Sequence, residues 1–338
     1  SEDIFNKAQR LIEKRQPKHQ PARVTSSTYL LSGLMKCGKC GHTYGVTSVS
    51  FSPDGKLVAG GGVDNNIKIW EVSSGDEVQT LQLPTDDQAY GAVTLAFSPD
   101  GKYLLTGSSE YAVWLWEISS GNVIKTFEHP SKDILSVAFS PDGRQFATAG
   151  NSSPAIRTWD ISSGAELTSF AKDSRFASAV AYSPDGKYIL ASSSGRLSRF
   201  SRSPRLWNIT TGEEVLRFEG HDDSVLSLAF SRDGNFIVTG GADNTARLWD
   251  AASGKEIRSF GGFARNVTDI ALSHSGKHLL TGGQDQTARL WNLETGYEVR
   301  GYTGLSGSVS SIAFSSDDKL VLAGSKNIAQ LLDVQTGK

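Results

Sequence analysis

The stretch that decides the fold is VTSVSFSPDGKLVAGG, residues 46–61, in which two alternating apolar segments flank the tetrapeptide SPDG. Proline and aspartate favour a type I turn, and glycine accepts the positive φ that closes a hairpin between two strands. The tetrapeptide recurs, first intact and then in weakened form, at residues 98–101, 140–143, 183–186, 231–234, 273–276 and 315–318. Each copy therefore predicts an antiparallel pair of strands joined by a tight turn.

Two further strands are predicted after each hairpin. A third apolar segment ends in tryptophan, and a Ser/Thr-Gly turn separates it from a fourth segment such as EVLRF at residues 214–218. The marker residues of the third segment are Trp70, Trp116, Trp159, Trp207, Trp249 and Trp291, with Leu332 at the seventh position. Seven units of four short strands predict an all-β fold: a closed, seven-bladed β-propeller of four-stranded antiparallel blades.

These units resemble the WD40-repeat family over residues 41–338. The Trp-Asp dipeptide occurs at residues 159–160 and 249–250, and the family's Gly-His pair occurs at residues 41–42 and 220–221. The resemblance implies a buried hydrogen-bond network within a blade that joins histidine, aspartate and tryptophan. The residues expected in two such networks are His42, Asp64 and Trp70 in the first blade, and His221, Asp243 and Trp249 in the fifth.

The same family network includes a serine or threonine, which we expect two residues before the aspartate. Glycine stands there instead, at Gly62, Gly241 and Gly283. The sequence thus predicts that no blade carries the full set of four residues.

Residues 1–40 form a predicted N-terminal unit ahead of the propeller. Ile4, Phe5, Ala8 and Leu11 would share one face of a short helix that ends before Pro17. The last repeat stops at residue 338, where its fourth strand should begin. We therefore expect a segment between about residues 29 and 40 to supply a closing strand, which would cover an otherwise exposed sheet edge.

The N-terminal unit also resembles a fragment of a large serine recombinase. EDIFNKAQRLIEKRQ at residues 2–16 is similar to the end of the recombinase domain, and LLSGLMKCGKCGHTYG at residues 30–45 to the first knuckle of its zinc ribbon. A structural zinc takes four ligands, whereas Cys37, Cys40 and His42 provide three. The cysteines are therefore weak metal candidates, and the alternative is a pair of free thiols on the closing strand. No metal or other cofactor is expected.

The sequence contains no pattern that argues for an enzyme. The six histidines show no metal-ligand spacing, no nucleophile elbow occurs, and the glycines mark single turns rather than a phosphate loop. In the family, the loops before the first strand and between the second and third strands form the usual partner-binding face. The residues that the repeat places there are Tyr44, Tyr90, Lys132, Arg175, Phe176, Asp223 and Arg265.

The fourth unit has a longer loop on that face. ASSSGRLSRFSRSP at residues 191–204 replaces the shorter TGGADNTA of the fifth unit at residues 239–246. Arg196, Arg199 and Arg202 lie in it without an intervening acid. Arginine binds carboxylates and phosphates through paired hydrogen bonds, which favours an acidic or phosphorylated partner. A solvated loop without a ligand is the alternative.

Charge and composition complete the expectations. The net charge of −2 combines a basic head, with eight Lys/Arg and three Asp/Glu in residues 1–43, with a mildly acidic body. No apolar run is long enough for a membrane helix, and two cysteines agree with a reducing, cytoplasmic location. The sequence predicts a monomeric, non-catalytic scaffold for a protein or peptide partner. The alternative is a DNA-associated module that uses the basic head, with nucleic acid as its partner.

Overall fold

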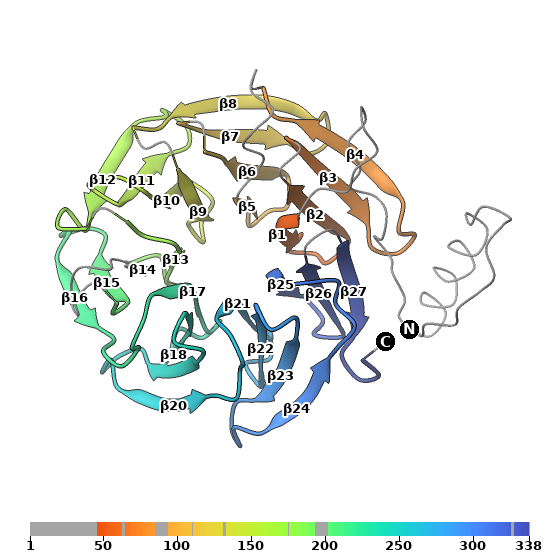
Figure 1. The fold of residues 1–338 in the computed structure, drawn as a ribbon. Coiled ribbons are helices and arrows are strands. Elements are labelled where there is room, and N and C mark those ends of the chain that lie inside the picture. Colours follow the sequence, from red (N-terminus) through yellow and green to blue (C-terminus); the bar gives the residue numbers. More distant parts are fainter. Residues whose placement is uncertain are drawn as a thin grey trace, which may run out of the picture.

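The computed structural model describes residues 46–62, 65–84, 94–109, 111–130, 133–174, 176–192, 202–325 and 328–337. These residues form seven antiparallel sheets arranged as blades around a central channel, which confirms the predicted propeller (Figure 1). The predicted N-terminal helix, closing strand, cysteine pair and recombinase-like segment lie outside the described residues.

Six blades have four strands each, hydrogen-bonded in chain order, and three strands of blade 7 are described. Blade 1 contains β1 (Val46–Phe51), β2 (Leu57–Gly62), β3 (Asn66–Glu71) and β4 (Glu77–Gln82); blade 2 contains β5 (Thr94–Phe97), β6 (Tyr103–Gly107), β7 (Ala112–Glu117) and β8 (Asn122–Glu128). Blade 3 contains β9 (Ile134–Phe139), β10 (Gln145–Gly150), β11 (Ile156–Asp160) and β12 (Glu166–Phe170); blade 4 contains β13 (Val180–Tyr182), β14 (Tyr188–Ala191), β15 (Arg205–Asn208) and β16 (Glu214–Arg217). Blade 5 contains β17 (Val225–Phe230), β18 (Phe236–Gly241), β19 (Ala246–Asp250) and β20 (Glu256–Phe260). Blade 6 contains β21 (Val267–Leu272), β22 (His278–Gly283), β23 (Ala288–Asn292) and β24 (Glu298–Tyr302), and blade 7 contains β25 (Val309–Phe314), β26 (Leu320–Ser325) and β27 (Ile328–Asp333).

The SPDG turns have the geometry that their residues predict. The Ser52 hydroxyl donates to the Asp54 carboxylate at 2.7 Å and accepts the Leu57 N–H at 2.9 Å. The Gly55 N–H closes the turn on the Ser52 carbonyl at 2.8 Å, and Gly55 has a φ of 70°. Serine, aspartate and glycine therefore each satisfy a separate requirement of the turn, which explains why this tetrapeptide sets the first hairpin of the blades.

The core lies between neighbouring blades rather than within any one of them. Each third-strand tryptophan is buried, and the seven apolar clusters draw their residues mainly from two adjacent blades. In one cluster Val46 and Val49 of β1 pack with Leu322 of β26 and Leu331 of β27. Blades 1 and 7 are thus in contact, and the ring is closed. Trp114 of β7, which stands where most blades have Lys or Arg, is also buried.

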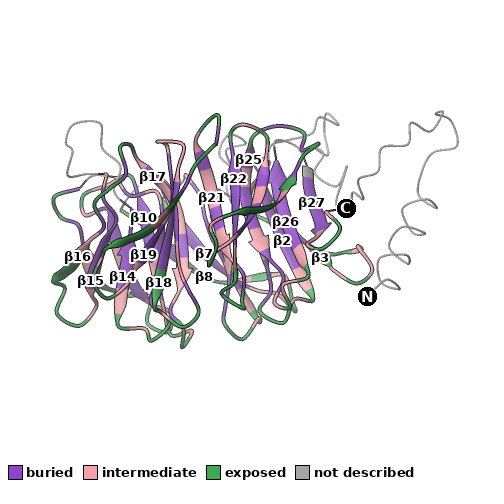
Figure 2. Ribbon diagram, turned by 90° about the horizontal axis from the view of Figure 1, so that it is seen from below, coloured by how far each residue is buried: buried purple, intermediate pink, exposed green. Residues whose placement is uncertain are grey.

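Loops connect the strands at two opposite faces of the disc. Seen edge-on, exposed residues lie at those two faces and along the outermost strands, and buried residues fill the inner strands (Figure 2). We call the face with the loops that enter the first strand and join the second to the third the loop face. The opposite face, with the SPDG-type turns and the turns from third to fourth strand, is the turn face.

Candidate functional site

Ten residues were predicted to bind a partner on the loop face, and the structure describes four of them. Phe176, Arg202, Asp223 and Arg265 are described, in the loops of blades 4, 5 and 6. The predicted residues outside the described ranges are Tyr44, Tyr90, Lys132, Arg175, Arg196 and Arg199.

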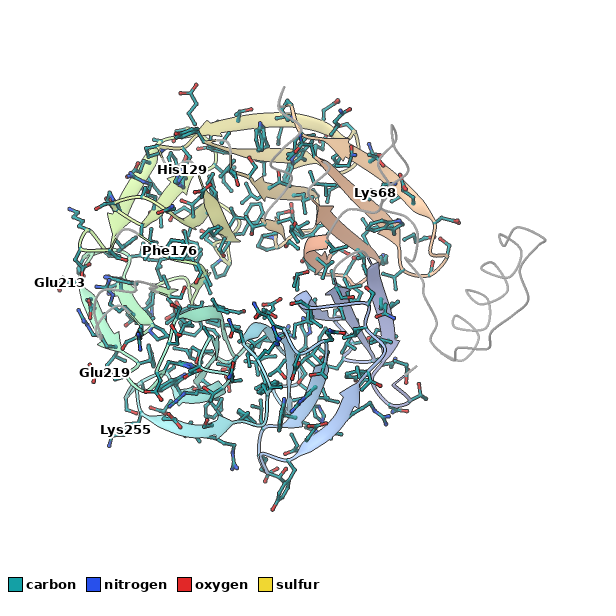
Figure 3. All side chains as sticks on the ribbon, in the orientation of Figure 1. Lys68, His129, Phe176, Glu213, Glu219 and Lys255 are labelled. Atoms are coloured by element: carbon teal, nitrogen blue, oxygen red, sulfur yellow. The ribbon has the colours of Figure 1, made fainter. Side chains whose placement is uncertain are left out.

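The four described residues do not form one cluster of interacting side chains. Asp223 and Arg265 are exposed, and Phe176 is half-buried and lies nearer the centre of the ring than the outer-edge residues labelled in Figure 3. The Arg202 guanidinium donates to the backbone carbonyl of Asp222 in the next blade. Arg202 is thus bonded across the joint between blades 4 and 5, whereas Asp223 and Arg265 present their charges to solvent.

Below this face, blade 5 contains a complete buried chain of four side chains. The Trp249 Nε1–H donates to the Thr239 hydroxyl oxygen at 2.9 Å. Nε2 of His221 lies 2.7 Å from that oxygen, and Nδ1 lies 2.8 Å from the Asp243 carboxylate. The Asp243 carboxylate also accepts the backbone N–H of Asp222 at 3.1 Å. The chain therefore fixes the entering loop of blade 5, including the segment that carries Asp223, onto the blade below.

This chain corrects the expectation that no blade carries the full network. Thr239 stands four residues before Asp243 rather than two, and Gly241 lies at the position where the hydroxyl had been expected. A Cβ at Gly241 would lie 2.6 Å from the Asp243 carboxylate and 2.7 Å from His221, so glycine is required by the contact itself. The aspartate lies in the turn beyond β18, whereas the hydroxyl lies within β18. There Thr239 pairs with Arg247 of β19, two residues from Trp249 on the same strand. The expected spacing did not allow for the residues between them.

Other blades retain parts of this chain. In blade 3 the Thr148 hydroxyl contacts both His129 at 2.9 Å and Trp159 at 3.1 Å. In blades 2 and 6 a threonine hydroxyl accepts the tryptophan N–H at 2.9 Å, from Trp116 to Thr106 and from Trp291 to Thr281. The Thr281 hydroxyl also donates to the Arg289 carbonyl at 3.3 Å. Blade 1 has glycine at the threonine position, and the buried Trp70 Nε1 has no hydrogen-bond partner in the described part. His42 and Asp64 of the network predicted for that blade lie outside the described residues.

Asp243 links the blade 5 chain to solution pH. Burial alone would raise the pKa of this carboxyl, but hydrogen bonds from His221, Thr245 and the Asp222 N–H outweigh it and hold the pKa well below 3.8. A carboxyl with a depressed folded-state pKa contributes stability above its unfolded pKa, and this stability is lost as the pH falls towards the folded value.

We therefore expect Asp243→Asn to reduce stability at neutral pH and to flatten the acid side of the stability profile below about pH 4. Urea unfolding of wild type and variant between pH 3 and 7 measures this difference. Asp223→Asn, at an exposed carboxyl of the same blade, is the control. Parallel acid limbs for wild type and Asp243→Asn would contradict the assignment.

Tyr111 is a loop-face residue that the sequence reasoning missed. It occupies the left-handed position just before the third strand, with a φ of 55°. Asn65, Asn244 and Gln286 occupy the corresponding position in blades 1, 5 and 6 with φ of 60°, 64° and 68°. Asparagine tolerates this conformation, whereas a bulky aromatic residue is strained in it. The Tyr111 side chain is nevertheless 53% exposed, so burial in the core does not offset the strain. The signal was present in the sequence as a tyrosine aligned with two asparagines.

The central channel is lined with hydroxyl side chains of the inner strands, and Asp269 of β21 is the one charged residue among its described lining residues. Burial raises the pKa of Asp269, although hydrogen bonds from Ser227 and backbone N–H groups oppose the rise. Within the described ranges no three His, Cys, Asp or Glu side chains come together as a metal site would require. The described residues also include no helix long and apolar enough to span a bilayer.

Comparison with known families agrees with this architecture. The WD domain, G-beta repeat profile matches residues 35–71, 78–117, 212–250, 254–292 and 296–330, which together exceed half of the chain. The chain belongs to the WD40 repeat family. WD40 propellers commonly act as protein-interaction scaffolds and typically lack enzymatic activity. A second profile, the eukaryotic translation initiation factor eIF2A, matches residues 106–219.

Three curated relatives share short segments with the chain. The Periodic tryptophan protein 2 homolog of Dictyostelium discoideum is 42% identical over 50 residues, which is 15% of this chain and 5% of that protein. The Probable serine/threonine-protein kinase PkwA of Thermomonospora curvata is 54% identical over 39 residues, 12% of this chain and 5% of the kinase. Protein Mut11 of Chlamydomonas reinhardtii is 38% identical over 61 residues, 18% of this chain and 16% of that protein. The chain thus spans a small part of each relative.

Proposed function

We propose that this WD40 protein is a non-catalytic scaffold that binds a protein or peptide partner on its loop face, with Tyr111 as an anchor. The observation that carries the proposal is the strained, exposed conformation of Tyr111. Backbone strain of this kind persists where the surrounding structure imposes it and clusters at functional sites. Tyrosine is also enriched among the residues that dominate binding energy at protein interfaces.

The surroundings of Tyr111 explain how the strain is maintained. The His129 N–H donates to the Tyr111 carbonyl at 2.6 Å, and the His129 ring is bonded to Thr148 in the buried core of blade 3. The turn of blade 2 is therefore fixed to the core of blade 3 through its backbone. Because the backbone that carries Tyr111 is already fixed, binding would have to order only its side chain, which favours its use as an anchor. The exposed charges of Asp223 and Arg265 on the same face would contribute to orientation of the partner.

The finer proposal concerns the partner's chemistry. Arg196, Arg199 and Arg202 remain the basis for an acidic or phosphorylated partner, and Arg202 is described as bonded to the neighbouring blade rather than free. We therefore place the anchor at Tyr111 and assign the arginine loop to selection among partners.

Tyr111→Asn tests the proposal because it installs the residue that blades 1 and 5 use at this turn. Stability should rise by about 1 kcal/mol through relief of the left-handed strain. Partner capture from a lysate should fall at the same time, because the aromatic anchor is lost. The measurements are urea unfolding and affinity capture with quantitative mass spectrometry, with and without nuclease.

Tyr297→Asn is the matched control, since Tyr297 is 77% exposed but lies on the turn face, just before the fourth strand of blade 6. It should leave capture unchanged. If both variants capture the same proteins as wild type, the loop-face anchor is wrong. Partners that disappear on nuclease treatment would instead favour the nucleic-acid alternative.

A further inference from the structure

Amides at one register position of the inner strands donate hydrogen bonds across the joints between blades. At four joints the acceptor is a hydroxyl on the neighbouring inner strand, and the bonds are long. These are the amides of Val49, Val137, Val180 and Ile270, which donate to Ser311, Thr94, Ser136 and Ser227 at 3.2, 3.3, 3.3 and 3.3 Å. The ring is thus connected around the channel by a repeated hydroxyl–amide contact.

Asp269 replaces the hydroxyl in blade 6 and changes this contact. One of its carboxylate oxygens accepts the Ile312 N–H of blade 7 at 2.8 Å. The other oxygen accepts the Ser227 hydroxyl of blade 5 at 2.6 Å and the N–H of Ile270, the next residue in blade 6, at 2.9 Å. Because carboxylate hydrogen bonds are shorter and about twice as strong as neutral ones, one side chain bridges three blades more firmly than serine would.

A second carboxylate bridges blades 6 and 7 at the turn face. Asp318 accepts the backbone N–H groups of His274 and Ser275 at 2.6 and 2.8 Å. At four other joints a turn proline of one blade packs beside the turn glycine of the next. These pairs are Pro53 with Gly101, Pro99 with Gly143, Pro141 with Gly186, and Pro184 with Gly234. Proline has no N–H to donate. This bridge is possible because His274 stands where those other turns have proline, and its backbone N–H donates to Asp318.

The joint between blades 7 and 1 offers a direct contrast. Its described side-chain bonds come from hydroxyls: Ser311 contacts Val49, and the Ser310 hydroxyl donates to the Val46 carbonyl at 2.5 Å. Both sides of blade 7 are therefore bonded, but the carboxylates lie on the blade 6 side. The two sides should differ in how readily they open.

We infer that Asp269 and Asp318 latch blades 5, 6 and 7 into one unit that opens less readily than the rest of the ring. Local opening has a free energy that varies across a structure, and contiguous segments often open together. With the latch closed, blades 5, 6 and 7 form one such segment. The ring then opens first at the joint between blades 7 and 1. This inference concerns the propeller itself and does not depend on the proposed partner.

Hydrogen exchange of the full chain, read by residue, tests the latch. In wild type the Ile312 amide should exchange at least about tenfold more slowly than Val49, Val137 and Val180, the amides at the same register position, because a carboxylate bond adds to local stability. Asp269→Ser installs the residue that blades 1, 3, 5 and 7 have at this position, so the variant retains a residue type that the fold accepts. It should remove the difference and accelerate exchange throughout β25 and β26.

Ser136→Ala is the control, because it removes one hydroxyl contact outside the unit and should affect only the joint between blades 3 and 4. A carboxylate also slows the chemical step of exchange at a neighbouring amide. An effect of Asp269→Ser confined to Ile312 and Ile270 would therefore overturn the latch, as would equal exchange of Ile312 and Val137 in wild type.

Asp318→Asn provides a second test that leaves the channel unchanged. Asparagine suits the left-handed conformation of this position, where φ is 58°, but its NH2 group would face one of the two N–H donors. Exchange should accelerate in β22 and β26 on both sides of the joint. Asp317→Asn, whose hydrogen bonds stay within the blade 7 turn, is the matched control. Equal exchange in the two variants would contradict a role for Asp318.

Discussion

Thr239→Val should lower the free energy of unfolding by about 2–4 kcal/mol, because it leaves two buried polar groups without a partner. Valine has nearly the same shape as threonine, so the packing of blade 5 is retained while its hydroxyl is lost. The groups that lose their partner are the Trp249 N–H, which donates to Thr239 at 2.9 Å, and His221 Nε2 at 2.7 Å. Urea unfolding followed by tryptophan fluorescence measures the loss.

The other blades supply a graded control for this prediction. Thr106→Val leaves only the Trp116 N–H without its partner, and should cost about 1–2 kcal/mol. Thr148→Val removes the hydroxyl that both His129 and Trp159 contact, so its loss of stability should resemble that of Thr239→Val. If all three variants lose the same stability, the cost comes from the substitution and not from the length of the buried chain.

Gly282→Ala should destabilise the propeller by about 1–3 kcal/mol through overpacking of the joint between blades 6 and 7. A Cβ at Gly282 would lie 2.6 Å from a Val309 methyl group and 3.2 Å from one of Ile312. Val309 is fully buried and β-branched, so it cannot turn away, and a backbone shift is required. Thermal and urea unfolding both measure the effect.

Gly261→Ala is the control, since no atom lies within 4 Å of the position that its Cβ would take. It should change the free energy of unfolding by less than about 0.5 kcal/mol. A Gly282→Ala variant as stable as Gly261→Ala would show that this joint is loosely packed. That result would also weaken the argument for a latched three-blade unit.

The repeat was predictable from sequence because its signals are local. The Ser52–Asp54 turn and the buried third-strand tryptophan depend on residues a few positions apart, and the structure confirms both. Thr239 was missed because the hydroxyl must face a tryptophan on the adjacent strand, a requirement set by sheet register rather than by distance from Asp243. Register is a property of paired strands, so the spacing within one strand did not reveal it.

The loop face was only partly predictable. Repeat alignment predicted Asp223 and Arg265 on it, and both are exposed in the structure. The alignment could not show that Arg202 donates to the backbone of the next blade. Asp269 was also missed, because the two hydrogen bonds that it makes to other blades involve residues 42 positions before and 43 positions after it. Such contacts arise only when neighbouring blades are packed together. The residues of the N-terminal unit remain predictions.

The turn-face contacts have a direction, since each proline packs on a glycine of the following blade and never of the preceding one. Every such pair depends on which blade comes next, and not on where the chain is cut. Circular permutation, with new termini in a loop and the old ones joined, would keep every described neighbour pair. Exchanging blade 6 or blade 7 with another blade would not, because it would separate His274 from Asp318. For this propeller, blade order carries structural information that the choice of termini does not.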